Sequence, residues 1–138
     1  MSLAIFDLDN TLIAGDSDHG WGQFLVDHQL VDVESYQQKN DQFYADYERG
    51  ALDIEAYHRF SLEPLTQHSM NRLEALHEQF MQEVITPMRL SKAEALLAKH
   101  RAAGDYLLII TSTNGFITSP IAKALGVDDI LATEAEIK

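Results

Sequence analysis

The sequence contains no cysteine, few basic residues and no long apolar run, and each absence excludes a class of protein. Without cysteine, its 138 residues form neither disulfides nor thiolate metal sites. Ten lysines and arginines stand against 22 aspartates and glutamates, and a net charge of -12 argues against nucleic acid and anionic membranes as partners. No basic leader or membrane-length apolar segment is present, so we expect a cytoplasmic protein.

The pattern of apolar residues divides the chain into an α/β part and a helical part. Apolar runs at 3–6 and 106–110 predict buried strands, and a weaker run covers 129–132. Buried strands that alternate with helices indicate a parallel, Rossmann-like α/β sheet. Residues 1–14 and 88–138 are therefore predicted to form this α/β core, whereas 15–87, which show no strand pattern, form an inserted all-helical unit.

Helix boundaries follow from capping residues. Ser17 is the expected N-cap of the first of four helices in the insertion. Ser91 and Glu94 have the spacing of a capping box for a helix that Gly104 ends. A later helix spans about 117–125, in which Pro120 is tolerable only if it falls in the first turn.

Polar residues follow both main strands where each strand ends. Asp7 to Thr11 follow the first strand, and Thr111 to Gly115 follow the second. Ligands of parallel sheets bind at the carboxyl ends of the strands, so these segments are expected to be neighbours. A carboxylate there can attack phosphorus and form an acyl phosphate, while hydroxyl and N–H groups hold the phosphoryl oxygens and a divalent cation neutralises charge.

These residues resemble a known family. The segment DLDNT matches the DxDxT signature of haloacid dehalogenase-like (HAD) phosphatases, and IITSTN is similar to their second motif. The helical region resembles the cap of the phosphoserine phosphatase-like subgroup. The resemblance implies a HAD core with an inserted helical cap, and a Mg²⁺-dependent phosphatase that acts on a small phosphorylated metabolite through aspartyl phosphate.

The resemblance also implies roles for individual residues. Asp7 is the nucleophile and Asp9 the general acid and base, and Mg²⁺ is held by the Asp7 carboxylate and the Asp9 backbone carbonyl. Thr113 holds the phosphoryl group in preference to Thr111 or Ser112. Three further residues are assigned to the substrate-binding loops: Thr11, Asn114 and Gly115.

Alternative interpretations exist for these motifs. Asp7 and Asp9 are also compatible with a turn at a strand end, but an EF-hand is excluded because Leu12 and Asp18 stand where glycine and glutamate are required. The motifs do not distinguish a phosphatase from a phosphotransferase or phosphomutase. A non-catalytic protein that binds phosphate or a partner is the other open class.

An acidic segment at the start of the helical insertion indicates an amine-bearing substrate. Phosphoserine phosphatases bind the substrate amine with an acid at the position of Asp16, so Asp16, Asp18 and His19 are assigned to substrate binding. The subgroup's carboxylate-binding arginine falls on Ser61, two residues from Arg59, which makes histidinol phosphate a competitor of phosphoserine. Alternatively, Asp16 and Asp18 are ordinary acids at a helix start. The aromatic residues of the insertion, Trp21, Phe24 and those at 36–47, are expected in its apolar core, with an aromatic cage around a ligand as the alternative.

One departure from the family concerns the C-terminal side. The family's lysine and acidic metal-binding pair follow the second motif at a distance that neither Lys123 nor Lys138 fits. We therefore interpret the chain as incomplete, and expect 138 residues alone to be nearly inert. Strands added on the far side of 3–6 would then be missing, so this strand is expected to be a free edge through which the chain dimerises or associates.

Overall fold

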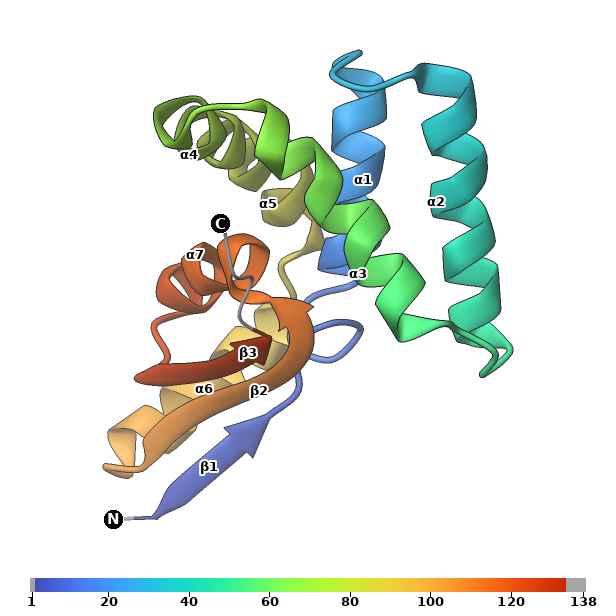
Figure 1. Ribbon diagram of the computed structural model, residues 1–138. Coiled ribbons are helices and arrows are strands. Elements are labelled where there is room, and N and C mark those ends of the chain that lie inside the picture. Colours follow the sequence, from blue (N-terminus) through green and yellow to red (C-terminus); the bar gives the residue numbers. More distant parts are fainter. Residues whose placement is uncertain (1, 134–138) are drawn as a thin grey trace.

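A three-stranded parallel sheet forms the centre of the α/β part in the computed structural model, which describes residues 2–133 (Figure 1). Strands β1 (Leu3–Phe6), β2 (Tyr106–Asn114) and β3 (Asp129–Thr133) lie in the order β1-β2-β3. Ile5 pairs with Leu108, and Ile109 pairs with Ile130, in parallel register. The predicted parallel, Rossmann-like α/β fold is confirmed.

Only one face of this sheet is covered within the described residues. Helices α6 (Ser91–Ala102) and α7 (Gly115–Leu125) connect strands that advance in one direction, so right-handed crossovers place both helices on the same side. Leu107 and Ile109 point to that side and are fully buried. On the opposite face four apolar side chains are 45% to 57% exposed: Leu3, Ile5, Ile110 and Leu131.

Between β1 and α6 the chain forms helices, apart from one isolated antiparallel bridge between Ile13 and Arg89. The helices are α1 (Ser17–Asp27), α2 (Val33–Glu48), α3 (Ile54–Leu62), the 3₁₀ helix η1 (Glu63–Gln67), α4 (Met70–Phe80), the π-helical turn η2 (Met81–Ile85) and α5 (Thr86–Met88). None of the described helices combines the length and apolarity that a membrane span requires. The entry and exit of this segment adjoin, since the Ala14 N–H donates to the Met88 carbonyl over 2.8 Å.

An aromatic cluster ties α1 to the α/β part. The Trp21 ring lies 5.2 Å from Phe80 of α4 and 5.6 Å from Phe116 of α7, measured between ring centroids. His77 is buried in the same cluster and its Nε2–H donates to the Ile117 carbonyl over 2.9 Å, while burial lowers the pKa of its imidazole. Trp21 is thus buried as expected, but in an interface that holds the insertion against the core.

Two expectations about helix starts and prolines were wrong. Ser91 is the first residue of α6 rather than its cap, because Leu90 takes the N-cap position with no capping side chain. Glu94 instead forms an ion pair with Arg89. Pro120 lies beyond the first turn of α7, where its missing N–H leaves the carbonyl four residues earlier without a helical partner.

Candidate active site

The loop after β1 presents two carboxylates on opposite sides of a buried leucine. Leu8 is fully buried, and its carbonyl accepts N–H groups from residues 11 to 13, which curls the loop. The Asn10 N–H donates to the Gly15 carbonyl over 2.9 Å, and both residues have positive φ angles, of 57° and 150°. This turn fixes the direction of Asp9, whereas Asp7 lies exposed before it.

The loop after β1 and the end of β2 meet at Asp9; residues 111–114, which were expected to follow the second strand, belong to it. Thr113 Oγ1 donates to Asp9 Oδ2 over 3.0 Å, and the Ser17 backbone N–H donates to Asp9 Oδ1 over 2.8 Å. Burial raises the pKa of the Asp9 carboxyl, and the charge of Asp16 raises it further, while the hydrogen bonds from Ser17 and Thr113 act in the opposite direction. A carboxyl with a raised pKa suits proton transfer to a leaving oxygen.

Asp7 has the properties of a cation ligand. Its carboxylate is exposed, and Asp7 Oδ1 accepts a hydrogen bond from the Leu8 N–H over 2.8 Å. Carboxylate and carbonyl oxygens are the donors that Mg²⁺ prefers, so the residues at this strand end fit the ion. Within residues 2–133 no group of three or more imidazole or carboxylate side chains forms a metal cluster, so the fit rests on the strand-end oxygens.

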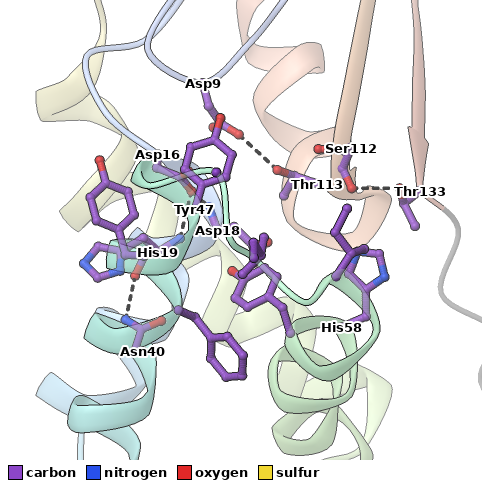
Figure 2. Close-up of a pocket in the computed structure, with 16 residues that line it drawn as sticks. Asp9, Asp16, Asp18, His19, Asn40, Tyr47, His58, Ser112, Thr113 and Thr133 are labelled. Carbon is purple, nitrogen blue, oxygen red and sulfur yellow. Dashed lines mark hydrogen bonds between the residues drawn. The ribbon is translucent and has the colours of Figure 1, made fainter.

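A cavity of about 470 Å³ lies between the strand ends and the helical insertion (Figure 2). Its wall on the α/β side carries hydroxyls, and its wall on the insertion side carries acidic, histidine and aromatic side chains. The principal groups are the acids Asp9, Asp16 and Asp18, the aromatic residues Phe43, Tyr44, Tyr47 and Tyr57, the histidines His19 and His58, and the hydroxyls of Ser112, Thr113 and Thr133. None of the described lining residues is a lysine or an arginine.

Asp16 and Asp18 differ in their environment although both begin α1. Asp16 is the N-cap, because its Oδ1 accepts the N–H groups of Asp18 and His19, each over 2.9 Å, so the predicted cap at Ser17 was wrong. Burial raises the pKa of the Asp18 carboxyl to about 7; the neighbouring Tyr57 hydroxyl lowers it, and the charges of Asp16 and Asp9 raise it. Both acids line the cavity with His19.

Other predicted site residues do not reach the cavity. The Asn114 side chain accepts the Ile117 N–H over 3.2 Å and is the N-cap of α7, which begins at Gly115. Thr11 is exposed, and its N–H donates to the Leu8 carbonyl. Their assignment to substrate binding, like that of Asp7 to catalysis, stays a prediction.

Several lining residues were missed at the level of sequence. Phe43, Tyr44 and Tyr47 of α2 face the cavity, although residues 36–47 were expected in an apolar core; Tyr36, which packs on Phe60 with centroids 4.3 Å apart, does lie there. The close spacing of three aromatic residues on one helix was the available signal. No sequence pattern pointed to Thr133, whose hydroxyl donates to the Ser112 carbonyl over 2.7 Å.

The chain combines a parallel α/β sheet with an inserted helical segment, as the sequence motifs implied. Residues 4–138 match the model of the haloacid dehalogenase-like hydrolases, and the chain belongs to this family. The recognised resemblance is therefore confirmed at the level of the family and of the fold.

The chain spans about three fifths of the length of the relatives that it matches. A histidinol-phosphatase of Neisseria meningitidis is 44% identical over 135 residues, which are 98% of this chain and 61% of that protein. A crystal structure of a protein of unknown function from Bordetella pertussis Tohama I is 40% identical with a TM-score of 0.90, over 99% of this chain and 62% of that one. A phosphoserine phosphohydrolase-like protein from Francisella tularensis shares the fold, with 16% identity and a TM-score of 0.69, over 100% of this chain and 61% of that one.

Proposed function

We propose that the full-length protein is a Mg²⁺-dependent phosphomonoesterase that acts through aspartyl phosphate on a small phosphorylated amine, with histidinol phosphate preferred to phosphoserine. One observation carries the proposal. The cavity combines the Asp9–Thr113 pair with acidic and aromatic residues of the insertion, and its described lining contains no basic residue. The 44% identity to a protein named histidinol-phosphatase supports it.

Each side chain at the strand ends has a chemical task in this reaction. Asp7 attacks phosphorus, and the bond to the ester oxygen breaks as that oxygen takes a proton from Asp9. Asp9 then removes a proton from a water molecule, which hydrolyses the acyl phosphate and regenerates Asp7. Mg²⁺, when held by the Asp7 carboxylate and the Asp9 carbonyl, supplies positive charge beside the phosphoryl oxygens.

Thr113 has two potential acceptors during this cycle. Its hydroxyl now donates to Asp9 Oδ2, and the same group lines the cavity in which a phosphoryl group would lie. The hydroxyl therefore positions the Asp9 carboxyl in the free protein and contacts a phosphoryl oxygen once substrate enters.

The surroundings of Arg59 disfavour a substrate carboxylate. Ser61, at the position expected for the arginine of phosphoserine phosphatases, is buried and donates to the His58 carbonyl over 3.3 Å. The exposed Arg59 pairs with Glu55 over 3.6 Å and does not line the cavity. A phosphoserine carboxylate would meet three acids without a compensating guanidinium from the described residues, which is unfavourable.

This proposal refers to the full-length protein, because the chain spans 61% of its histidinol-phosphatase relative. The lysine and acidic pair that the resemblance implies are not matched within 138 residues, so the 138-residue chain alone is predicted to be inactive. Association through the free edge of β1 and a cytoplasmic location also remain proposals.

The test is a substrate comparison. The purified full-length protein is assayed for phosphate release from histidinol phosphate, phosphoserine and p-nitrophenyl phosphate, with Mg²⁺ and with EDTA. We expect Mg²⁺-dependent turnover, with the highest kcat/KM for histidinol phosphate. A parallel preparation of the Asp7→Asn variant measures contaminating phosphatases. Preference for phosphoserine would contradict the substrate assignment, and turnover in EDTA would contradict the metal assignment.

A further inference from the structure

Strand β2 carries a bulge near its carboxyl end. Its pairing with β3 is regular up to Ile110, which lies opposite Leu131. The next pair is Asn114 with Thr133, so β2 places three residues, 111–113, opposite a single residue of β3. Bulges interrupt the ladder of hydrogen bonds and redirect side chains, and they are frequent beside active sites.

The bulge changes the direction in which the side chains of β2 point. More buried and less buried side chains alternate over 106–110, as in a regular strand. Thr113 and Asn114 break this alternation, because both are buried although they are neighbours. The Thr113 hydroxyl donates to Asp9, and Asn114 caps α7. The orientation of Thr113 therefore depends on the bulge.

Two threonine hydroxyls bond to the peptide unit between Ser112 and Thr113. The Thr133 hydroxyl donates to the Ser112 carbonyl over 2.7 Å (Figure 2). The Thr113 N–H of the same peptide unit donates to the Thr111 hydroxyl over 3.2 Å. Side chains thus bond to both polar groups of a peptide inside the bulge, where the ladder is irregular. Thr111 belongs to β2 itself, whereas Thr133 ties the peptide to another strand.

We propose that Thr133 is a positioning residue for Thr113: its hydroxyl fixes the bulge of β2 to the end of β3, and thereby holds the Thr113 hydroxyl toward Asp9 and the phosphoryl end of the cavity. Thr133 acts through the backbone of Ser112 rather than on the reacting atoms. This inference rests on the proposed phosphatase function, because that function assigns the phosphoryl group to Thr113.

The experiment compares full-length wild type with Thr133→Val, which removes the hydroxyl and keeps the shape, and with Thr133→Ser, which keeps the donor. Thr66→Val is the matched control. The Thr66 hydroxyl also donates to a backbone carbonyl over 2.7 Å, that of Glu63, but it lies on η1 outside the cavity. Circular dichroism verifies that each variant is folded.

Three quantities are measured with Mg²⁺ present: kcat/KM for histidinol phosphate, kcat/KM for p-nitrophenyl phosphate, and the affinity for inorganic phosphate by calorimetry. We expect Thr133→Val to lower all three by about threefold to tenfold, the effect of one hydrogen bond. The factors should be similar, because all three ligands share the phosphoryl group. Thr133→Ser and Thr66→Val should stay within about twofold of wild type.

A double variant separates action through Thr113 from direct contact with substrate, since Thr133 also lines the cavity. In a Thr113→Val background the hydroxyl to be positioned is absent. Thr133→Val should therefore cost less than about twofold there, which is a non-additive result. An undiminished cost in this background would overturn the positioning role.

The remaining outcomes distinguish this inference from the proposed function. In an active enzyme, no loss in Thr133→Val, an equal loss in Thr133→Ser, or a loss confined to histidinol phosphate would overturn the role of Thr133 and leave the phosphatase proposal intact. If wild type hydrolyses neither substrate, the proposed function fails, and the phosphate affinities of the same variants decide the role of Thr133. Wild type that also binds no phosphate would overturn both.

Discussion

The hydroxyl of Thr113 donates a hydrogen bond of 3.0 Å to the carboxylate of Asp9, across a sequence separation of 104 residues. This contact joins the carboxyl ends of β1 and β2, which are neighbours because the two strands pair in parallel. It places a hydroxyl donor beside a carboxyl whose pKa burial has raised. In the proposed mechanism, this single contact between two strands would join the group that transfers protons to the group that binds the phosphoryl oxygens.

Replacement of Thr113 tests this contact. Thr113→Val removes the hydroxyl but keeps the volume, and we expect kcat/KM on p-nitrophenyl phosphate to fall about tenfold to hundredfold in the full-length enzyme, because a hydrogen bond to a charged group contributes ~1.5–3 kcal/mol. Thr113→Ser retains the donor and should remain within about threefold of wild type. Steady-state kinetics measure both, and equal losses in the two variants would show that the methyl group matters instead.

Replacement of Asp7 and replacement of Asp9 are predicted to reduce activity to different extents. Asp7→Asn should abolish turnover of every substrate, because an amide neither attacks phosphorus nor binds Mg²⁺ well. Asp9→Asn loses general acid and base catalysis, which contributes typically ~10²–10⁴-fold, and should retain a trace of activity on p-nitrophenyl phosphate, whose leaving group needs little protonation. Wild-type rates in the Asp7 variant would refute the mechanism.

Most of the fold was predictable because its signals are local. The short apolar run from Leu3 to Phe6 forms the predicted strand, although it is not buried as expected, because Leu3 and Ile5 are more than half exposed. Gly104 and Gly126 end helices in the left-handed conformation, with φ of 78° and 75°. The extension of β2 to Asn114 was not predicted, since its last residues are polar and their pairing with Thr133 follows an irregularity in the register.

The candidate site was predictable where it depends on strand ends, and not where it depends on helix packing. Asp9 follows β1 and Thr113 lies among the last residues of β2, so their proximity follows from the parallel pairing of the two strands. Asp16 and Asp18 look alike in sequence, and only the extended backbone of Asp16, with φ -102° and ψ 116°, makes it the cap. Whether Tyr44 faces a cavity or a core depends on how α2 lies against α1, which no local pattern records.

The raised pKa of Asp18 predicts a pH-dependent stability difference. The unfolded carboxyl ionises near pH 4, whereas the folded one stays protonated up to about pH 7. The contribution of this group to the free energy of unfolding is therefore fully present below pH 4, decreases as pH rises from about 4 to 7, and is constant above. As the pH rises from 5 to 8, the free energy of unfolding of Asp18→Asn should therefore increase relative to that of wild type.

Urea denaturation of the full-length protein at the two pH values, without metal or substrate, measures this difference. Asp27→Asn, on the exposed side of the same helix, is expected to keep the wild-type pH profile. If the difference in the free energy of unfolding between Asp18→Asn and wild type is the same at pH 5 and pH 8, Asp18 has the same pKa in the folded and the unfolded protein.

The uncovered sheet face predicts self-association of the 138-residue chain. In the described residues β1 pairs with β2 alone, and Leu3 and Ile5 are more than half exposed. Such edges recruit further strands, and exposed apolar patches drive association. Sedimentation velocity should therefore show dimers or larger species. Ile5→Lys should shift the distribution toward monomer, whereas Val33→Lys, which adds the same charge to the exposed start of α2, should not. A monodisperse wild-type monomer would contradict the prediction.

Asp16 provides the last prediction, because its role as a helix cap predicts effects unlike those of Asp18. Its Oδ1 accepts two N–H groups at the start of α1, and the next residue, Ser17, donates its N–H to Asp9. Asparagine is a comparable N-cap, so Asp16→Asn should change stability little, while Asp16→Ala should lower the free energy of unfolding by about 0.5–2 kcal/mol. Loss of the cap also loosens the support of Asp9, so Asp16→Ala should lower kcat/KM for histidinol phosphate and p-nitrophenyl phosphate by similar factors. Urea denaturation and parallel kinetics on the full-length protein check both parts. A loss confined to histidinol phosphate in Asp16→Asn would mean that Asp16 binds the substrate cation directly, and that its hydrogen bonds to α1 are secondary to that contact.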